Sequence, residues 1–235
     1  MEPLELLHEP AGLESFALPD AIAGLYPGSF GLPRECVYAN FVQTIDGVVA
    51  LPGVARSNRL IADGSEADLF VMALLRACAD AIVIGSKTLL ASPKNRWTAE
   101  AAFPAAADAF AELRRTLGLE EQPHVVVLTR ARDFETTTEL RERLSIRPDA
   151  AEAIGELRAG GRGRILCEGG PTLFGNLLAG GLVDELFLTV SPLFAGDGLS
   201  LVESVPLLPD LRVAASLAGV RRHGAHLFLR YAVER

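Results

Sequence analysis

The stretch that decides the fold reads Ile165-Leu166-Cys167-Glu168-Gly169-Gly170-Pro171-Thr172-Leu173-Phe174-Gly175-Asn176-Leu177-Leu178. Its first three residues are apolar and predict a short buried strand. Two glycines then allow a sharp turn, and Pro171 suits the first position of a helix, where its missing N–H would have no partner. The helix carries an apolar face and is closed by Gly180-Gly181. This order of strand, glycine turn and helix predicts an α/β unit.

The same turn is a candidate ligand site. Its glycines lack a Cβ, so a ligand can approach the backbone closely, and the free N–H groups and dipole of a helix start favour a phosphate. Glu168 stands at the carboxyl end of a predicted central strand, where open α/β sheets bind their ligands. A tight connection without any ligand is the alternative interpretation, and the turn alone does not decide between the two.

Composition narrows the possible classes of protein. The chain has 235 residues, 49% of them apolar, and a net charge of −8, which suits one large domain or two small ones. The negative charge argues against nucleic acid or an anionic membrane as a general partner. An anionic ligand must therefore be held by locally placed arginines and backbone amides. No apolar run is long enough to span a membrane, and the N-terminus lacks the layout of a signal peptide.

The cysteines indicate the compartment. Cys36, Cys78 and Cys167 are odd in number and far apart, and no C-x-x-C occurs. This pattern favours buried thiols in a reducing cytoplasm over a disulfide framework or a structural zinc site. We therefore expect a cytoplasmic protein without a metal.

Strand and helix patterns alternate along the chain. Strands are predicted at Cys36–Gln43, Val48–Leu51, Ala81–Ile84, His124–Thr129, Ile165–Cys167, Glu185–Val190, Arg212–Leu217 and His226–Val233. Helices are predicted at Ser65–Ala79, Ala105–Leu117, Pro148–Ala159 and after Pro171, and polar turns at Ser57–Arg59 and Gly85–Thr88. The alternation predicts an α/β fold with a mainly parallel central sheet, helices on both faces and an antiparallel C-terminal hairpin.

The domain division follows from the same patterns. Prolines interrupt residues 1–35, which we expect to be an irregular lead-in with one helical turn near Asp20–Leu25. Residues 36–235 show no linker and are expected to form a single domain. In a parallel sheet, the loops Asn40 to Asp46, Gly85 to Arg96, Thr129 to Arg132 and Glu168 to Asn176 would gather along one edge.

Two familiar motifs are missing. Gly85-Ser86-Lys87-Thr88 lacks the glycines of a phosphate-binding P-loop, and the signature of zinc deaminases does not occur. Three longer blocks, however, resemble the reductase domain of bacterial riboflavin biosynthesis, which has the dihydrofolate-reductase-like fold. They are V-Y-A-N-F-V-Q-T-I-D-G, S-E-A-D-L-F-V-M-A-L-L-R-A-C-A-D-A-I-V-I-G-S-K-T and E-G-G-P-T-L-F-G-N-L-L-A-G-G-L-V-D-E-L-F-L-T-V-S-P.

The resemblance implies a site for NADPH. The cofactor pyrophosphate would lie on the glycine turn and the helix after it, and further contacts would come from other strand ends. The implied cofactor residues are Val42, Thr88, Ser92, Thr129, Gly169, Gly170, Pro171, Thr172, Leu173, Phe174, Gly175 and Asn176. Because NADPH carries a phosphate on its adenosine ribose, Arg130 and Arg132 are candidates to bind that phosphate with paired hydrogen bonds.

The resemblance also implies a phosphorylated pyrimidine substrate whose ribosyl group is opened and reduced. Its implied contacts are Asn40, Ser57, Arg76, Arg96 and Glu168. Hydride addition needs a matching proton, and Asp46 and Glu168 are the candidate donors. A homodimer is expected, with Leu186–Val190 and its Pro192–Phe194 extension as the seam.

Two departures from the family pattern fall on the substrate side. Asn40 stands where the bifunctional enzymes commonly have Lys, and the Pro93–Trp97 loop has a different spacing. They leave open a reductase for a dihydropterin or another C=N or C=O compound. A nucleotide-binding protein without catalysis is the alternative from a different class.

Overall fold

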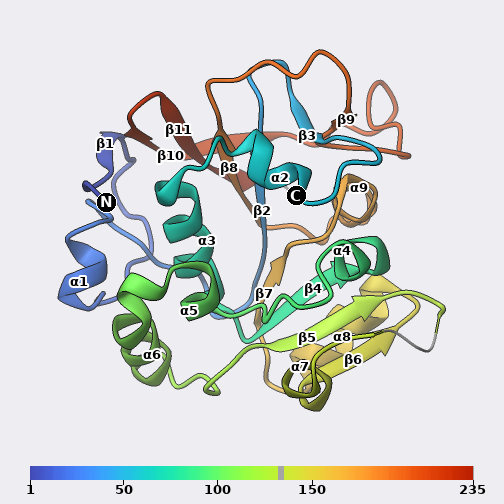
Figure 1. Ribbon diagram of the computed structural model, residues 1–235, viewed down its shortest axis with the longest axis horizontal. Helices are drawn as coiled ribbons and strands as arrows, with labels where there is room; N and C mark the ends of the chain where they lie inside the picture. The colour runs from blue at the N-terminus through green and yellow to red at the C-terminus, as the bar shows by residue number, and fades with distance from the viewer. Residues whose placement is uncertain (132–134, 235) are drawn as a thin grey trace.

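The computed structural model describes residues 1–131 and 135–234, which form a central mixed sheet with helices on both faces (Figure 1). The strand order is β1-β10-β11-β8-β2-β7-β4-β5-β6. These strands are β1 (Glu5–His8), β2 (Cys36–Gln43), β4 (Ala81–Gly85), β5 (His124–Leu128), β6 (Leu144–Arg147), β7 (Arg164–Cys167), β8 (Glu185–Val190), β10 (Ala215–His223) and β11 (His226–Val233). The run from β8 to β6 is parallel, and β11, β10 and β1 add antiparallel strands. The predicted fold class is confirmed.

Alternating side chains of the parallel strands build two separate cores. In β2, Cys36 and Tyr38 face one core, whereas Val37 and Ala39 face the other. The first core is covered by α1 (Asp20–Ala23), α3 (Glu66–Cys78), α5 (Ala99–Ala102) and α6 (Ala107–Thr116). The second is covered by α8 (Ala150–Ala159) and α9 (Pro171–Ala179). Burial on both faces explains why these strands read as continuous apolar runs.

Two predicted loops are short helices instead. Ser57–Ile61 forms α2, and Ser86–Ala91 forms α4 directly after β4. The predictions of polar turns there were wrong because Ser and Gly start helices as readily as they form turns. The helix at Ser65 was predicted well, since the Ser65 side chain accepts a hydrogen bond from the Asp68 N–H at 3.2 Å.

The C-terminal hairpin has a different turn from the expected one. β10 continues through Gly219 to His223, and its register against β11 shifts between Leu217 and Gly219. A glycine within a strand often marks such a bulge, so Gly219 was misread as part of the turn. The chain reverses around Gly224, which has φ of +58°.

The lead-in belongs to the sheet. β1 pairs antiparallel with β10, and Glu9 binds Arg221 at 2.5 Å. Three other elements were not predicted: β6, the short helix α7 (Thr138–Glu142) and the short strand β9 (Leu199–Ser200). β3 (Val48–Ala50) was predicted as a strand, and it pairs with β9 in a separate two-stranded sheet. The single-domain division itself stays a prediction. Within the described part of the chain, no helix is long and apolar enough to cross a membrane.

Candidate functional site

The candidate site lies where the parallel strands end. Because β2, β7, β4 and β5 are neighbours and run in the same direction, the segments that follow them start along one edge of the sheet. These segments contain the predicted loops after residues 40, 85, 129 and 168. Arg132, which was predicted for the cofactor phosphate, lies outside the described residues.

The glycine turn after β7 is open at one of its two glycines. A Cβ at Gly170 would have no atom within 4 Å, whereas a Cβ at Gly169 would meet the Leu173 side chain at 2.3 Å. Gly170 is the N-cap of α9, no side chain caps this helix, and Pro171 follows at its start. The backbone N–H groups of the first turn therefore have no side-chain acceptor and fit an anion. The turn meets the requirement for a pyrophosphate that the sequence suggested.

The remaining residues of α9 differ in what they can contact. Thr172 and Asn176 are exposed and Leu173 is half-buried. Phe174 is buried and contacts Phe41 in a tilted arrangement, with 4.9 Å between ring centroids, and Gly175 lies against the Glu203 carbonyl and Val202. Phe174 thus packs the helix against β2 and Gly175 lets the segment at Val202 approach it, and their roles toward a cofactor stay predictions.

Glu168 forms a buried ion pair with Arg76. The Arg76 Nε and Nη2 atoms donate to the two Glu168 oxygens at 2.8 and 2.7 Å. Arg76 is only 3% exposed, donates to the Thr98 carbonyl, and stands 5.4 Å from the centroid of the Trp97 ring. A solvated Arg76, the alternative to ligand contact, is excluded. The fork-to-fork pair fixes the Glu168 carboxylate at the end of β7.

Asp46 is held by the backbone of another loop. Its carboxylate accepts hydrogen bonds from Thr44 Oγ1 at 2.5 Å and from the N–H groups of Ala195 and Gly196. The Thr44 hydrogen bond, followed by those of Gly196 and Ala195, lowers the pKa of Asp46 to about 2. An ionised carboxylate has no proton to give, so this geometry speaks for a loop-fixing role and against the predicted role as donor.

The other predicted cofactor residues lie on separate elements of the same edge. Val42 is buried near the end of β2, Thr88 is half-buried within α4, and Ser92 ends that helix. Thr129 accepts a hydrogen bond from the Ala131 N–H at 3.1 Å, which leaves its hydroxyl hydrogen free, and Arg130 is exposed. The sheet order places Thr129 and Arg130 two strands from the glycine turn.

The predicted substrate residues are not all available. Asn40 is half-buried on β2. Ser57 is buried, and its hydroxyl accepts from the Leu51 N–H at 3.1 Å. Arg96 is exposed but donates to Glu139 at 2.9 Å, a hydrogen bond that raises the pKa of Arg96. Ser57 and Arg96 thus have partners within the protein, and the roles of all three residues toward a substrate stay predictions.

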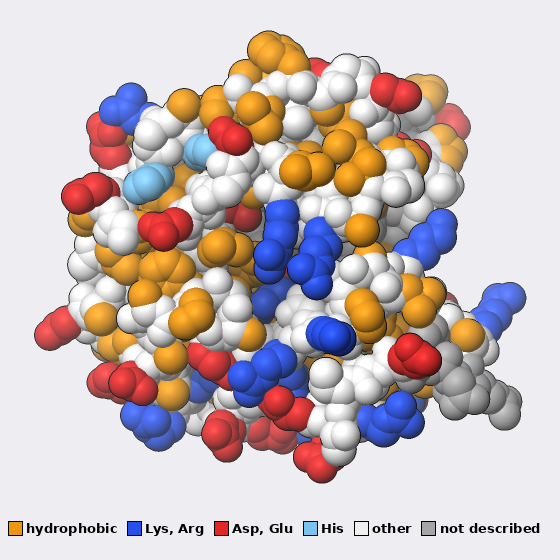
Figure 2. All heavy atoms as spheres, in the orientation of Figure 1, with side chains coloured by type: hydrophobic (Ala, Val, Ile, Leu, Met, Phe, Trp, Pro, Cys, Tyr) orange, Lys and Arg blue, Asp and Glu red, His pale blue; other side chains and the backbone are white. Residues whose placement is uncertain are grey.

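A basic cluster was missed by the sequence interpretation. Figure 2 shows Lys and Arg side chains gathered in the middle of one face, over the region between α2 and α4. Arg56, Arg59 and Lys87 belong to or adjoin these helices, are exposed, and form no ion pair with the described acidic residues. Arg56 also has φ of +54°, which is rare outside glycine and clusters at functional sites. In the sequence, the only signal that could have indicated this cluster was the presence of these three basic residues in an acidic chain.

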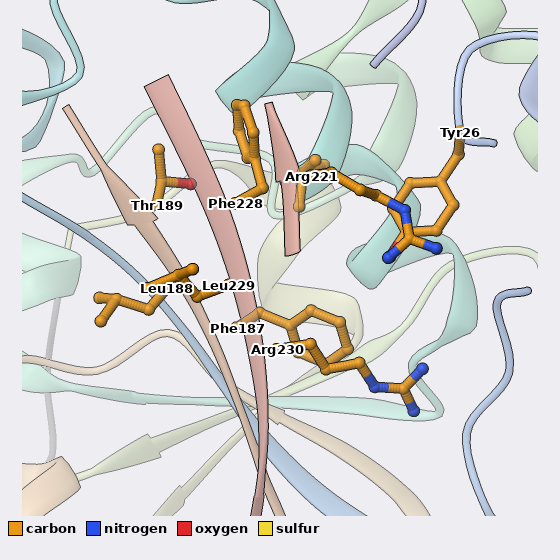
Figure 3. A pocket seen from close by; sticks show the side chains of 9 residues that line it. Tyr26, Phe187, Leu188, Thr189, Arg221, Phe228, Leu229 and Arg230 are labelled. Atoms are coloured by element: carbon orange, nitrogen blue, oxygen red, sulfur yellow. The ribbon is translucent and has the colours of Figure 1, made fainter. Parts of the chain in front are cut away.

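A small cavity lies elsewhere, between α3 and the antiparallel strands (Figure 3). The Arg221 guanidinium stacks on Tyr26 at 4.0 Å, and Arg230 binds Glu185 at 2.6 Å and lies near Phe187. These contacts attach the lead-in to β10 and β11. The polar groups of this cavity are therefore mostly used within the protein.

Residues 1–131 and 135–234 contain neither a disulfide nor a cluster of metal-binding side chains. No group of three or more His, Cys, Asp or Glu could hold a metal there. Cys36, Cys78 and Cys167 are free and buried, as predicted, and burial raises the pKa of Cys167 to about 12.

The sheet order and the two cores define an α/β protein of the dihydrofolate-reductase-like fold. The family model described as RibD C-terminal domain matches residues 35–227, and the chain belongs to this family. The chain is 30% identical to the 2,5-diamino-6-ribosylamino-4(3H)-pyrimidinone 5′-phosphate reductase of Methanothermobacter thermautotrophicus, covering 72% of this chain and 84% of that protein. It is 31% identical to the riboflavin biosynthesis protein RibD of Corynebacterium ammoniagenes, covering 88% of this chain and 57% of that protein.

Solved structures agree on the fold. A pyrimidine reductase-like protein from Corynebacterium diphtheriae superposes with a TM-score of 0.67 at 20% identity, over 89% of this chain and 97% of the other. RibD from Acinetobacter baumannii gives a TM-score of 0.61 at 18% identity, over 86% of this chain and 58% of the other.

Proposed function

We propose that this protein is an NADPH-dependent reductase of riboflavin-biosynthesis type, acting on a 5-amino-6-(5-phosphoribosylamino)uracil-like substrate. The observation that carries the proposal is the open Gly170 turn at the start of α9. Glu168, just before this turn, is fixed by its buried ion pair with Arg76. The first provides a place for a pyrophosphate and the second a fixed carboxylate for a polar substrate. The name of the Methanothermobacter relative as a reductase and that of the Corynebacterium relative as a riboflavin biosynthesis protein support the same activity.

The residues would divide their work by position. The turn from Gly169 to Thr172 would hold the pyrophosphate, Thr88 and Ser92 would contact the cofactor from α4, and Val42 would lie near the nicotinamide. Bound NADPH would supply a hydride, and the chain would supply position and charge. Thr129 and Arg130 would face the adenosine end.

On the substrate side, Glu168 would accept hydrogen bonds from the ring or the ribose. Asn40 would add an amide from β2, and Arg56 and Arg59 are better placed than Arg96 to attract a phosphate, because Arg96 is bound to Glu139. The ribosyl C1′ would gain the hydride, and the opened O4′ would gain a proton.

Two alternative functions make different predictions for the same assay of NADPH oxidation. A reductase for a dihydropterin is favoured by Asn40 in place of Lys and by the altered loop at Pro93 to Trp97. A nucleotide-binding protein without catalysis would bind NADPH and oxidise it with none of these compounds. The organised Arg76–Glu168 pair favours an enzyme.

The deciding experiment measures NADPH oxidation at 340 nm with the phosphoribosylamino-pyrimidine, with its dephosphorylated form and with dihydropterin. We expect turnover with the phosphorylated pyrimidine and a higher KM without the phosphate. Arg130→Ala should raise the KM for NADPH and leave that for NADH nearly unchanged. Equal losses with both cofactors would remove Arg130 from phosphate recognition.

We also propose a cytoplasmic homodimer, with a seam that includes the predicted strand Leu186–Val190. β8 is an interior strand between β2 and β11, so Leu186–Val190 could meet a second copy through its face and not through its edge. Its second face, together with β11 and β10, carries half-exposed or exposed apolar side chains. They include Leu186, Val190, Leu217, Leu227, Leu229 and Tyr231. This face supports the dimer better than the strand edge.

A further inference from the structure

We infer that Trp97 is a positioning residue, which holds the Glu168 carboxylate ready for the substrate by fixing the Arg76 guanidinium against its ring. This role rests on the reductase function proposed above, in which Glu168 accepts hydrogen bonds from the substrate. The sequence interpretation placed Trp97 only at the end of the Pro93–Trp97 loop.

Three neighbours fix the guanidinium of Arg76. Its Nε and Nη2 atoms donate to Glu168, its Nη1 atom donates to the Thr98 carbonyl at 3.3 Å, and its Cζ atom lies 5.4 Å from the centroid of the Trp97 ring. Trp97 and Thr98 are consecutive, so one short piece of backbone supplies both contacts outside the ion pair. Since both oxygens of Glu168 are bound to this guanidinium, the orientation of the carboxylate follows that of Arg76.

Trp97 has a backbone conformation that costs free energy. Its φ is +54°, in the left-handed region that a bulky residue rarely adopts, and the residue is only 3% exposed. Such a conformation persists only where the surroundings fix it. Here the Trp97 N–H donates to Asn95 Oδ1 at 3.1 Å, and the carbonyl of Arg96 accepts a hydrogen bond from Arg143. Both sides of the strained residue are therefore held in place.

The indole N–H of Trp97 is a second cost at the same residue. Its Nε1 atom is buried and has no hydrogen-bond acceptor among residues 1–131 and 135–234. A buried donor without an acceptor destabilises a protein, and a phenylalanine or leucine would avoid that cost. Tryptophan, however, presents the aromatic face that attracts a cation most strongly. Two departures from the most stable choice thus coincide at a residue that contacts the Arg76 guanidinium, as is expected of a functional site.

A fixed carboxylate matters for binding as well as for catalysis. A ligand loses less free energy when the groups that receive it are already ordered. Without the Trp97 ring, the guanidinium would keep its hydrogen bond to Thr98 but lose the surface that covers its face, and Glu168 would move with it. Trp97 therefore affects the affinity for the substrate before any hydride is transferred.

The first test needs neither cofactor nor substrate. In protein labelled with ¹⁵N-arginine, the Arg76 Nε–H resonance is assigned in the wild type by NOEs to the indole ring, and its rate of hydrogen exchange is measured. Trp97→Leu should raise this rate about tenfold, because the fork to Glu168 opens more often, and Trp97→Phe, which keeps a ring, should raise it less. Phe103→Leu is the matched control, because it removes a ring that contacts Phe70 in the same core, and it should leave the rate unchanged.

The second test measures the dissociation constant of the phosphorylated pyrimidine by calorimetry in the absence of NADPH. Trp97→Leu should weaken binding about tenfold, within the range of a desolvated cation–π contact, and Trp97→Phe should recover part of the loss. Phe103→Leu should leave the dissociation constant unchanged. An equal change in Phe103→Leu and Trp97→Leu in either test would show a loss of core packing and would overturn the role of Trp97.

Asn95→Ala covers the case in which Trp97→Leu does not fold. It removes the acceptor of the Trp97 N–H from a half-buried loop position and should also raise the exchange rate, whereas Lys94→Ala, at the exposed neighbouring position, should not. Unchanged exchange in Trp97→Leu, or in Asn95→Ala, would overturn the role of Trp97. A wild-type protein that neither binds nor reduces the pyrimidine would instead overturn the proposed function, and the exchange rates would still show whether Trp97 fixes the pair.

Discussion

Arg76 and Glu168 are charged residues in the interior, with side chains 4% and 7% exposed. Glu168→Gln would leave the Arg76 guanidinium buried without its counter-charge. We expect this change to cost about 3–5 kcal/mol in the free energy of unfolding. Urea denaturation of the purified variant measures it.

The paired variant supplies the control. Replacing both residues, as in Arg76→Met with Glu168→Leu, removes the two charges together and should recover part of the loss. If the double variant loses as much as the sum of the single variants, the pair is not coupled. In activity assays, Glu168→Gln should impair turnover more than Asp46→Asn does.

Asp46 makes a pH-dependent contribution to stability. Its folded pKa of about 2 lies below the ordinary value of 3.8. The contribution is therefore complete above pH 3.8 and is lost as the pH falls through 2. Asp46→Asn should unfold at lower urea concentration than the wild type at pH 7, and the two midpoints should converge near pH 2.

Asp197→Asn is the matched control, because Asp197 is exposed and directly follows the Ala195 and Gly196 N–H groups that bind Asp46. It should leave the midpoint unchanged at both pH values. A difference between Asp46→Asn and the wild type that persists at pH 2 would show that the asparagine acts through packing and not through charge.

At the scale of elements, a substitution at the start of α9 is expected to change ligand binding without changing the fold. A side chain at Gly170 meets no protein atom, and the backbone there has φ of −73°. Gly170→Val should keep the melting temperature and weaken NADPH binding tenfold or more, about 1.4 kcal/mol. Gly155→Val, equally open but in α8, should leave binding unchanged. Calorimetric titration gives both dissociation constants, and an unchanged value for Gly170→Val would place the pyrophosphate elsewhere.

Local patterns predicted the long buried elements well. Cys36–Gln43 and Glu185–Val190 have the predicted bounds, because both strands are mostly buried and rich in apolar residues. β1 was missed because all four of its residues are exposed, which leaves no alternation to detect. α4 was missed because its first residues also suit a turn.

The site was harder to predict than the fold. Arg76 and Glu168 are 92 residues apart in the sequence, so no local pattern shows that they form a pair. Asp46 was predicted as a turn residue or a proton donor. Its hydrogen bond with the Ala195 N–H joins residues 149 positions apart, which no local pattern shows. The glycine turn was predictable, since its strand, glycines and proline are consecutive.

For the whole molecule, the apolar face of β8, β11 and β10 makes the dimer testable. Leu217 and Leu227 are 39% and 36% exposed there, and a charge on this face would have to be desolvated on association. Leu227→Arg should produce a monomer by light scattering at micromolar concentration. Leu60→Arg, on α2 and 59% exposed, should not change the mass. A monomeric wild-type protein would contradict the dimer itself.

The position of β2 has a consequence for the order in which the protein acquires its structure. Both of its neighbours come much later in the chain, since residues 36–39 pair with 164–167 and residues 38–43 with 185–190. During synthesis, this apolar strand leaves the ribosome long before either partner exists. Non-local pairing of this kind makes folding slow and leaves strand edges exposed to aggregation. The nascent chain is therefore expected to need a chaperone to shield β2 until the second half of the sheet has been translated.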